Sequence, residues 1–282
     1  MHRELTAGIL LLVLAAGVLH ASWNAITKAI EDRVTVIAWI GLTAAVLGAI
    51  GIALTGLPAK AAIGFALASA GIHVAYNFAL IRAYRLGAFN QTYPIARGTA
   101  PLLVALGAGV IAGEHLSPAA LAGVVLLGAG LMSLALTSGR PDRSEAPAVG
   151  AALLTGVAIA GYSLVDGLGV RHTSDPYSYT ALLFLLQGPV FALVAAAVRP
   201  PRAWVAGGLP WRGAAAGVLS VVAYGIVLWS QQRAPLAEVS ALRETGVISG
   251  AVMGALVFKE GFGARRVVSA VIVAGGIVLI AL

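Results

Sequence analysis

Residues 34–57 read VTVIAWIGLTAAVLGAIGIALTGL, a run without a charged side chain. The hydrocarbon core of a bilayer is about 30 Å thick, and a helix needs roughly 20 mainly apolar residues to cross it. The whole chain has this character, because 60% of its 282 residues are hydrophobic and only 10% are charged. A soluble domain carries about 25% charged residues. The composition therefore predicts an integral membrane protein and excludes a soluble enzyme or a nucleic-acid-binding protein.

Apolar runs of similar length recur along the chain, separated by short connections that contain charges, prolines or polar clusters. The longest polar connection, residues 139–147, falls in the middle of the chain. It predicts two halves, residues 1–139 and 148–282, joined by a linker at residues 140–147. Cutting at every interruption predicts an all-α protein with ten transmembrane helices, at residues 7–29, 34–57, 63–86, 90–112, 117–137, 148–171, 177–198, 211–232, 236–258 and 264–282.

Lys and Arg side chains are distributed unevenly between the two sides of the membrane that these spans define. The connections after odd-numbered spans hold twelve of them, whereas the N-terminal segment and the even-numbered connections hold four. Short cytoplasmic loops collect positive charge. The bias predicts that the linker is cytoplasmic and that both termini lie outside. We expect the membrane to be the plasma membrane, that is, the inner membrane of a bacterium. The basic residues behind the net charge of +7 therefore indicate how the chain is oriented in the membrane, and we predict no nucleic-acid partner.

The two halves are similar in sequence when the second is shifted back by 146 positions. Residues 97–99 (RGT) then align with residues 243–245 (RET), and Glu114 aligns with Glu260. Because each half has five predicted spans, an odd number, the two copies enter the membrane in opposite senses. This predicts two inverted five-helix repeats, an architecture that places a binding site near the midplane and suits alternating access.

Further motifs occur in a fixed order along the chain. The first span carries HASWN at residues 20–24, the fourth contains Pro94 and Pro101 and ends at Glu114, and the ninth ends with KE at residues 259–260. The closing span of each half is rich in glycine. In this combination the chain resembles the drug/metabolite transporter superfamily in its ten-helix form, with two EamA-type repeats. The resemblance implies a secondary transporter of small metabolites, with a central cavity lined largely by spans 1, 3, 4, 6, 8 and 9.

Two arginines lie deep inside predicted spans. Arg97 and Arg243 each follow the start of their span by seven residues, which places them about 10 Å into a core of about 30 Å. A charge at such a depth costs roughly 2.5–3.5 kcal/mol and therefore indicates a function. If both guanidinium groups face one cavity, they form a clamp for a carboxylate, phosphate or phosphonate group.

Three acidic residues within the predicted spans offer an alternative role for these arginines, as members of internal ion pairs. They are Glu244, Glu238 and Asp166. Glu244 directly follows Arg243, so on a helix the two side chains diverge by about 100°. We therefore expect Glu244 to be a poor partner for Arg243 and a better one for Arg97. Permanent pairing would remove the arginines from substrate binding.

Polar and aromatic side chains recur at helical spacing in several other spans, and such stripes face a cavity or a neighbouring helix. We expect His20 to carry a coupling proton and Asp166 to be its acidic counterpart, with His73 as a further coupling candidate. Hydrogen bonding between helices is the alternative for the His and Asn side chains. Besides the two arginines, the residues expected around the substrate are His20, Trp23, Asn24, Tyr76, Asn77, Tyr93, Tyr162 and Tyr224.

Motifs of enzymes do not occur in the sequence, which has no Gly-rich phosphate loop, no His-Glu-x-x-His and no Gly-x-Ser-x-Gly. We predict no catalytic residue, no cofactor and no metal site. The favoured function is secondary active transport of a small organic anion or zwitterion, by a monomer or homodimer embedded in the lipid bilayer. One alternative is a proton-coupled exporter of drugs or organic cations, which requires a carboxylate exposed in the cavity. The other is a membrane assembly or sensor protein that transports nothing.

Overall fold

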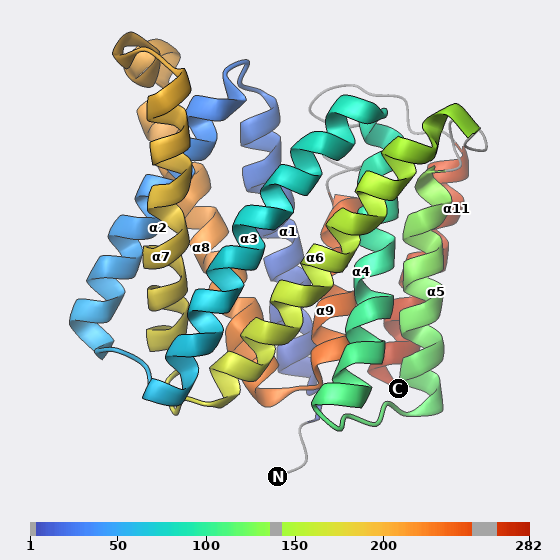
Figure 1. Ribbon diagram of the computed structural model, residues 1–282. Helices are drawn as coiled ribbons and strands as arrows, with labels where there is room; N and C mark the ends of the chain where they lie inside the picture. Colours follow the sequence, from blue (N-terminus) through green and yellow to red (C-terminus); the bar gives the residue numbers. More distant parts are fainter. Residues whose placement is uncertain (1–3, 136–142, 250–263) are drawn as a thin grey trace.

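The computed structural model describes residues 4–135, 143–249 and 264–282 of the chain. Within these ranges every regular element is a helix (Figure 1). The α-helices are α1 (Ala7–Lys28), α2 (Arg33–Thr55), α3 (Lys60–Leu86), α4 (Phe89–Ile111), α5 (Pro118–Ala135), α6 (Ala146–Arg171), α7 (Pro176–Val198), α8 (Leu209–Arg233), α9 (Leu236–Glu244) and α11 (Ala264–Ala281). Two 3-10 helices, Arg143–Glu145 and Pro201–Gly208, precede α6 and α8.

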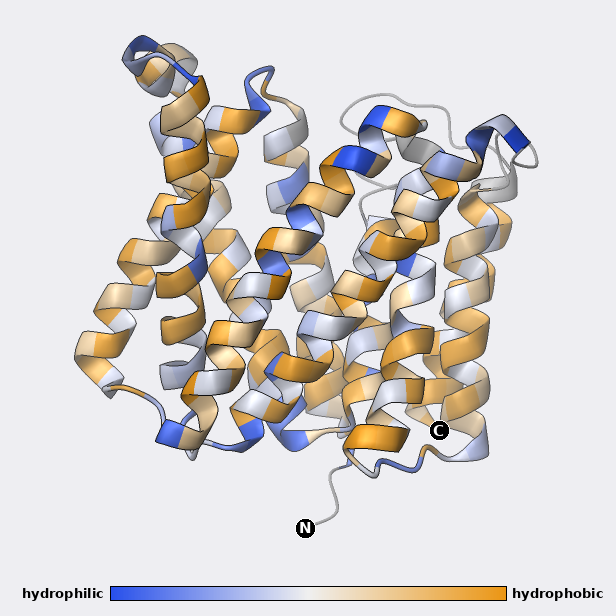
Figure 2. Ribbon diagram, in the orientation of Figure 1, coloured by the Kyte–Doolittle hydropathy of each residue, from blue (hydrophilic) through white to orange (hydrophobic). Residues whose placement is uncertain are grey.

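Eight of the described helices, α1 to α8, are long and apolar enough to cross a membrane, and α11 adds a shorter apolar stretch, Val267–Ala281. Hydrophilic residues gather at the two ends of the bundle, and hydrophobic residues cover its middle (Figure 2). Large apolar side chains of these helices face outward, such as Leu106, Leu193 and Val271 with exposed fractions of 67, 70 and 65%. A surface of this kind is solvated by lipid. The protein is therefore an integral membrane protein.

The first eight predicted spans coincide with α1 to α8, and their ends differ from the prediction by at most three residues. The predicted ninth span, residues 236–258, differs, because α9 ends at Glu244, Thr245 forms a turn and the helix resumes over residues 246–249. The Thr245 hydroxyl donates to the Leu242 carbonyl at 2.6 Å and so competes with regular helix bonding at this point. Residues 250–258 of this span and residues 136–142 around the predicted linker lie outside the described ranges.

Capping side chains explain where two of the helices begin. A carboxylate oxygen of Asp32 accepts from the Thr35 N–H at 3.2 Å at the start of α2. Asp175 accepts from the Ser178 N–H at 3.2 Å at the start of α7, where Pro176 occupies the first helical position. These side chains satisfy N–H groups that have no partner within the helix.

Helices of the first half pack mainly against helices of the second half. α2 lies along α7, α3 along α6, α5 along α11 and α1 along α8, while α4 contacts α5, α6 and α9. Glycines permit backbone contact at the closest approaches. A Cβ atom on Gly188 would collide with the Gly41 carbonyl oxygen, and one on Gly123 would lie 2.7 Å from the Gly276 carbonyl oxygen. The two halves therefore share one core.

An ion pair joins the halves at the upper end of the bundle in Figure 1, where α2 begins and α7 ends. Arg199 Nε lies 3.1 and 3.2 Å from the two carboxylate oxygens of Asp32. Burial alone would raise the pKa of the Asp32 carboxyl, but hydrogen bonds from Thr35 and Arg199 outweigh it and lower the pKa. The pair is thus kept at neutral pH and is lost as the pH falls through this lowered value. Both side chains are partly exposed, so it contributes at most about 1 kcal/mol.

A more buried contact joins the halves at the opposite end of the bundle. The chain turns after α4, and Glu114 Oε2 accepts from the N–H of Leu236, the first residue of α9, at 2.8 Å. Arg171 Nη2, at the end of α6, lies 2.7 Å from Glu114 Oε1. Arg171 also donates to two backbone carbonyls around the α8–α9 connection, at 2.9 and 2.8 Å. These bonds hold the ends of α4, α6 and α8 to the start of α9.

Candidate functional site

Three charged side chains form a cluster inside the bundle. Arg97 of α4 and Arg243 of α9 both bind the carboxylate of Glu244, also of α9. Arg97 Nη1 donates to Oε2 at 2.8 Å, and Arg243 donates to Oε1 from Nε at 3.1 Å and from Nη2 at 2.8 Å. Arg97, Arg243 and Glu244 are only 5, 4 and 1% exposed. Two buried cations therefore share one anion, and the cluster carries an excess positive charge.

The local structure of two helices positions these groups. Arg97 lies between Pro94 and Pro101, eight residues after the start of α4, which is about 12 Å along the helix axis. Each proline removes a backbone N–H from the helix, and both flank the charged position. Arg243 and Glu244 occupy the last turn of α9. The negative end of the helix dipole stabilises the guanidinium group of Arg243 there.

The contact between Glu244 and Arg97 agrees with the expectation drawn from the sequence, whereas the contact with Arg243 differs from it, because Glu244 was expected to be a poor partner for Arg243. The two residues are adjacent, but α9 ends at Glu244, and the long Arg243 side chain reaches Oε1 through two nitrogens. Neither arginine forms an ion pair with Glu238 or Asp166 in the part of the chain that the structure describes. Glu244 is thus the shared anion of the cluster, and both arginines take part in the internal ion pairs that were the alternative expectation, with one carboxylate for two guanidinium groups.

His20 of α1 extends the cluster. Its Nε2 lies 2.7 Å from Nη2 of Arg97. The other terminal nitrogen of Arg97, Nη1, binds Glu244. The indole Nε1 of Trp23, one turn further along α1, lies 3.3 Å from Nδ1 of His20, and the two rings meet edge to face. The cluster therefore combines side chains from α1, α4 and α9.

Tyrosine rings flank both guanidinium groups. The ring centre of Tyr93 lies 5.2 Å from Cζ of Arg97, and that of Tyr162 in α6 lies 5.6 Å from Cζ of Arg243. Tyr76 of α3 meets Tyr162 edge to face, with ring centres 5.7 Å apart. Such cation–π contacts stabilise cations that have lost their water. Three of the tyrosines expected around a substrate thus lie at or beside the charged cluster.

Asp166 of α6 belongs to a second buried network. It is fully buried, and its two carboxylate oxygens accept from the hydroxyl groups of Tyr179 at 2.9 Å and Tyr224 at 2.5 Å. The imidazole of His73 in α3 stacks on Tyr162, with ring centres 4.0 Å apart. Tyr162 therefore lies between His73 and Arg243 and connects the two networks through its ring.

Other residues expected at the site are turned toward their own helices. The side-chain amide of Asn24 donates to the His20 carbonyl, and that of Asn77 donates to the His73 carbonyl, both at 2.7 Å. Glu238 is 9% exposed and forms no ion pair with any other residue that the structure describes. The geometry therefore does not join these three side chains to the charged cluster.

Ser163 and Tyr179 also take part in the two networks, although neither is among the residues selected from the sequence. The Ser163 hydroxyl oxygen lies 3.2 Å from Arg243 Nη2 and donates to a carbonyl of its own helix. Serine is common in membrane helices, and a tyrosine near a helix end is typical of the membrane interface. Only the adjacency of Ser163 to Tyr162 was a usable signal.

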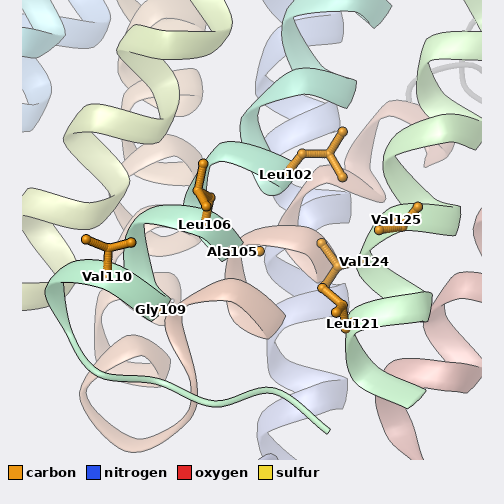
Figure 3. A pocket seen from close by; sticks show the side chains of 8 residues that line it. All are labelled: Leu102, Ala105, Leu106, Gly109, Val110, Leu121, Val124 and Val125. Carbon is orange, nitrogen blue, oxygen red and sulfur yellow. The ribbon is translucent and has the colours of Figure 1, made fainter. Parts of the chain in front are cut away.

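A surface groove between α4 and α5 is lined by apolar side chains, among them Leu102, Leu106, Val110, Leu121 and Val125 (Figure 3). Two of these residues, Leu106 and Val110, are 67 and 78% exposed. The lining suits lipid chains and offers no polar side chain to a metabolite. The charged cluster is therefore the better candidate for a functional site.

The fold and this cluster define an integral membrane helix bundle with charged groups held in its interior. Residues 146–282 match the model of the EamA-like transporter family, so the second half of the chain is an EamA-like transporter domain. This confirms the resemblance to the drug/metabolite transporter superfamily. A solved structure described as "Crystal structure of protein" has the same fold, with a TM-score of 0.77 over 96% of this chain and 94% of that chain, at 18% identity. No curated protein sequence matches the chain.

Proposed function

We propose that the protein is a secondary active transporter of a small organic anion or zwitterion, which binds beside Arg97, Arg243 and Glu244. The observation that carries this proposal is the sharing of one buried carboxylate by two buried guanidinium groups. Buried charges are normally compensated, because an unpaired one costs several kcal/mol. A carboxylate, phosphate or phosphonate group on a substrate would supply the missing negative charge and accept hydrogen bonds from arginine.

The packing of the halves supports alternating access by two inverted repeats, residues 1–139 and 148–282. α2 pairs with its counterpart α7, and α5 pairs with its counterpart α11. The counterpart of α1 is α6 and that of α8 is α3. Exchanging the two halves therefore turns the α1–α8 pair into the α3–α6 pair. A pseudo-two-fold axis in the membrane plane would produce this pattern. In the proposed cycle, the Glu114–Arg171 end and the Asp32–Arg199 end of the bundle open in turn.

The distribution of positive charge supports an orientation for this cycle. With the linker in the cytoplasm of a bacterial cell, the end that holds Asp32 and Arg199 faces the cytoplasm. The end that holds Glu114 and Arg171 then faces outward, together with both termini.

Export of organic cations receives less support from the same geometry. It requires a carboxylate that a ligand can reach. The carboxylate of Glu244 is already neutralised by two arginines, and that of Asp166 accepts from two tyrosine hydroxyl groups, so the geometry leaves no excess negative charge at either residue for a cationic ligand. A protein that only assembles or senses would have no need of an excess buried cation next to aromatic rings.

A thermal-shift experiment in detergent tests the proposed function. The probes are gluconate, glutamate, methylphosphonate and sulfate, with tetraphenylphosphonium as the cation. A ligand present at 100 times its Kd stabilises the folded state by about 2.7 kcal/mol. We expect at least one anion to raise the Tm of the wild type and of Arg212→Gln, an exposed arginine at the start of α8, but not the Tm of Arg243→Gln. Stabilisation by the cation alone, or by none of the anions, refutes the proposal.

A further inference from the structure

His20 faces two hydrogen-bond donors. Arg97 Nη2 lies 2.7 Å from its Nε2, and Trp23 Nε1 lies 3.3 Å from its Nδ1. Guanidinium and indole groups donate and cannot accept. A neutral imidazole has one N–H and one acceptor nitrogen, so it satisfies only one of these two donors. The shorter distance identifies Nε2 as the acceptor, which faces Arg97.

A second proton on His20 is incompatible with this arrangement. An imidazolium ring donates from both nitrogens, so its Nε2–H would point at an N–H of Arg97 across 2.7 Å. Both groups would also be positively charged. Arg97 must therefore move away from Nε2 when His20 binds a proton. The new N–H on Nε2 and the N–H that Arg97 no longer donates to His20 then face the same space. Arg97 can stay attached to Glu244 through Nη1 during this movement.

The charges around His20 decide what can stabilise the protonated form. The positive charges of Arg97 in α4 and Arg243 in α9 both repel a positive charge on His20, and the carboxylate of Glu244 binds both arginines. Two other helices pack on α1, namely α2 and α8. Their charged residues are Arg33, Arg212 and Arg233, all in a first or last helical turn, and Tyr224 of α8 donates to Asp166.

Protonation would therefore place three cations around one carboxylate in a site of low dielectric constant. Such an arrangement is strongly unfavourable unless another anion enters. A substrate anion would accept hydrogen bonds from the N–H of His20 and from the N–H that Arg97 releases. The proton and the anion each bind better when the other is present, which is a reciprocal coupling.

We propose that His20 is the coupling site of a proton–anion symport, in which Arg97 and a proton compete for its Nε2 atom. This inference rests on the proposed transport function. In each cycle one proton from the side of entry binds Nε2 as the anion binds Arg97. On the opposite side the anion leaves, the proton returns to water and Arg97 binds Nε2 again, so that one proton crosses with each anion.

Proteoliposomes that contain an internal pH dye test this coupling. The probes are radiolabelled gluconate and sulfate at pH 7.5, because both are fully ionised and polar and bring no proton with them. Wild type, His20→Gln and His115→Gln are compared. A glutamine at position 20 keeps an oxygen that can accept from Arg97 but cannot bind a proton. His115 is an exposed histidine in the α4–α5 connection and serves as the matched control.

We expect uptake of a labelled probe by the wild type and by His115→Gln to acidify the vesicle interior with about one proton per anion. Label that enters His20→Gln vesicles should carry at least tenfold fewer protons per anion than label that enters wild-type vesicles. Entry of label into wild-type vesicles without acidification overturns the proposal, and this result does not depend on any variant. Equal acidification by His20→Gln and wild type also overturns it. If neither probe enters wild-type vesicles, the transport function itself fails, which is a separate result.

Discussion

Replacement of Glu244 by glutamine removes the charge that holds the two buried arginines together. The carboxylate accepts three hydrogen bonds, at 2.8, 3.1 and 2.8 Å, and its side chain has no exposed surface. An amide of the same shape accepts through one oxygen only and directs its own N–H groups at the guanidinium groups. Removal of one partner from a buried ion pair costs about 3–5 kcal/mol. We expect Glu244→Gln to lose stability in this range.

Thermal unfolding in detergent measures this loss. By the size dependence of Tm, about 3–5 kcal/mol corresponds to a decrease on the order of 10 °C. The double variant Arg243→Gln, Glu244→Gln leaves only one uncompensated cation and should be more stable than Glu244→Gln alone. Glu238→Gln is the control on the same helix and should not lower the Tm, because the Glu238 carboxylate forms no ion pair with another described residue. A Tm of Glu244→Gln equal to that of wild type would refute the view that this carboxylate compensates both arginines.

Three further substitutions test the packing and the two networks. Gly188→Val should separate α2 from α7 and cost about 1–3 kcal/mol in a thermal melt, whereas Gly64→Ala, whose Cβ would meet nothing within 4 Å, should not lower the Tm; equal losses would contradict the close approach. Tyr224→Phe removes a donor to a buried carboxylate and should cost about 1.5–3 kcal/mol in the same melt, and an unchanged Tm would count against that bond. Arg171→Gln should loosen the end of the bundle that holds Glu114, so that a cysteine introduced by Ser240→Cys into this cysteine-free chain reacts faster with a membrane-impermeant maleimide. An unchanged reaction rate would show that Arg171 does not close that end.

The membrane-spanning helices could be predicted from the sequence because the bilayer imposes a length of roughly 20 apolar residues on each one. The span at residues 34–57 could be recognised without any knowledge of tertiary packing, and the structure has a helix there, at Arg33–Thr55. Arg97 and Arg243 could be selected for the same reason, since a charge within such a run is rare.

The pairing of Arg97 with Glu244 agrees with the expectation from the sequence, but the second contact of Glu244, with Arg243, could not be predicted in the same way, because it depends on where α9 ends. The end of α9 at Glu244 places that residue against both arginines, whereas a continuous helix would direct it away from Arg243. Asn24 lies on the expected polar face of α1, yet its amide donates to its own helix. Helical periodicity identifies a polar face but does not determine which atoms on it find a partner within the helix.

Uptake of labelled gluconate and sulfate by proteoliposomes most directly tests the claim that the excess charge of the cluster binds an anion. In Arg97→Gln and in Arg243→Gln the remaining arginine still pairs with Glu244, so both variants should fold while their cluster loses its excess charge. The account predicts saturable uptake of at least one probe by wild type and a decrease of at least tenfold in each variant. Wild-type rates in both variants, or saturable uptake of tetraphenylphosphonium but of neither anion, would contradict it.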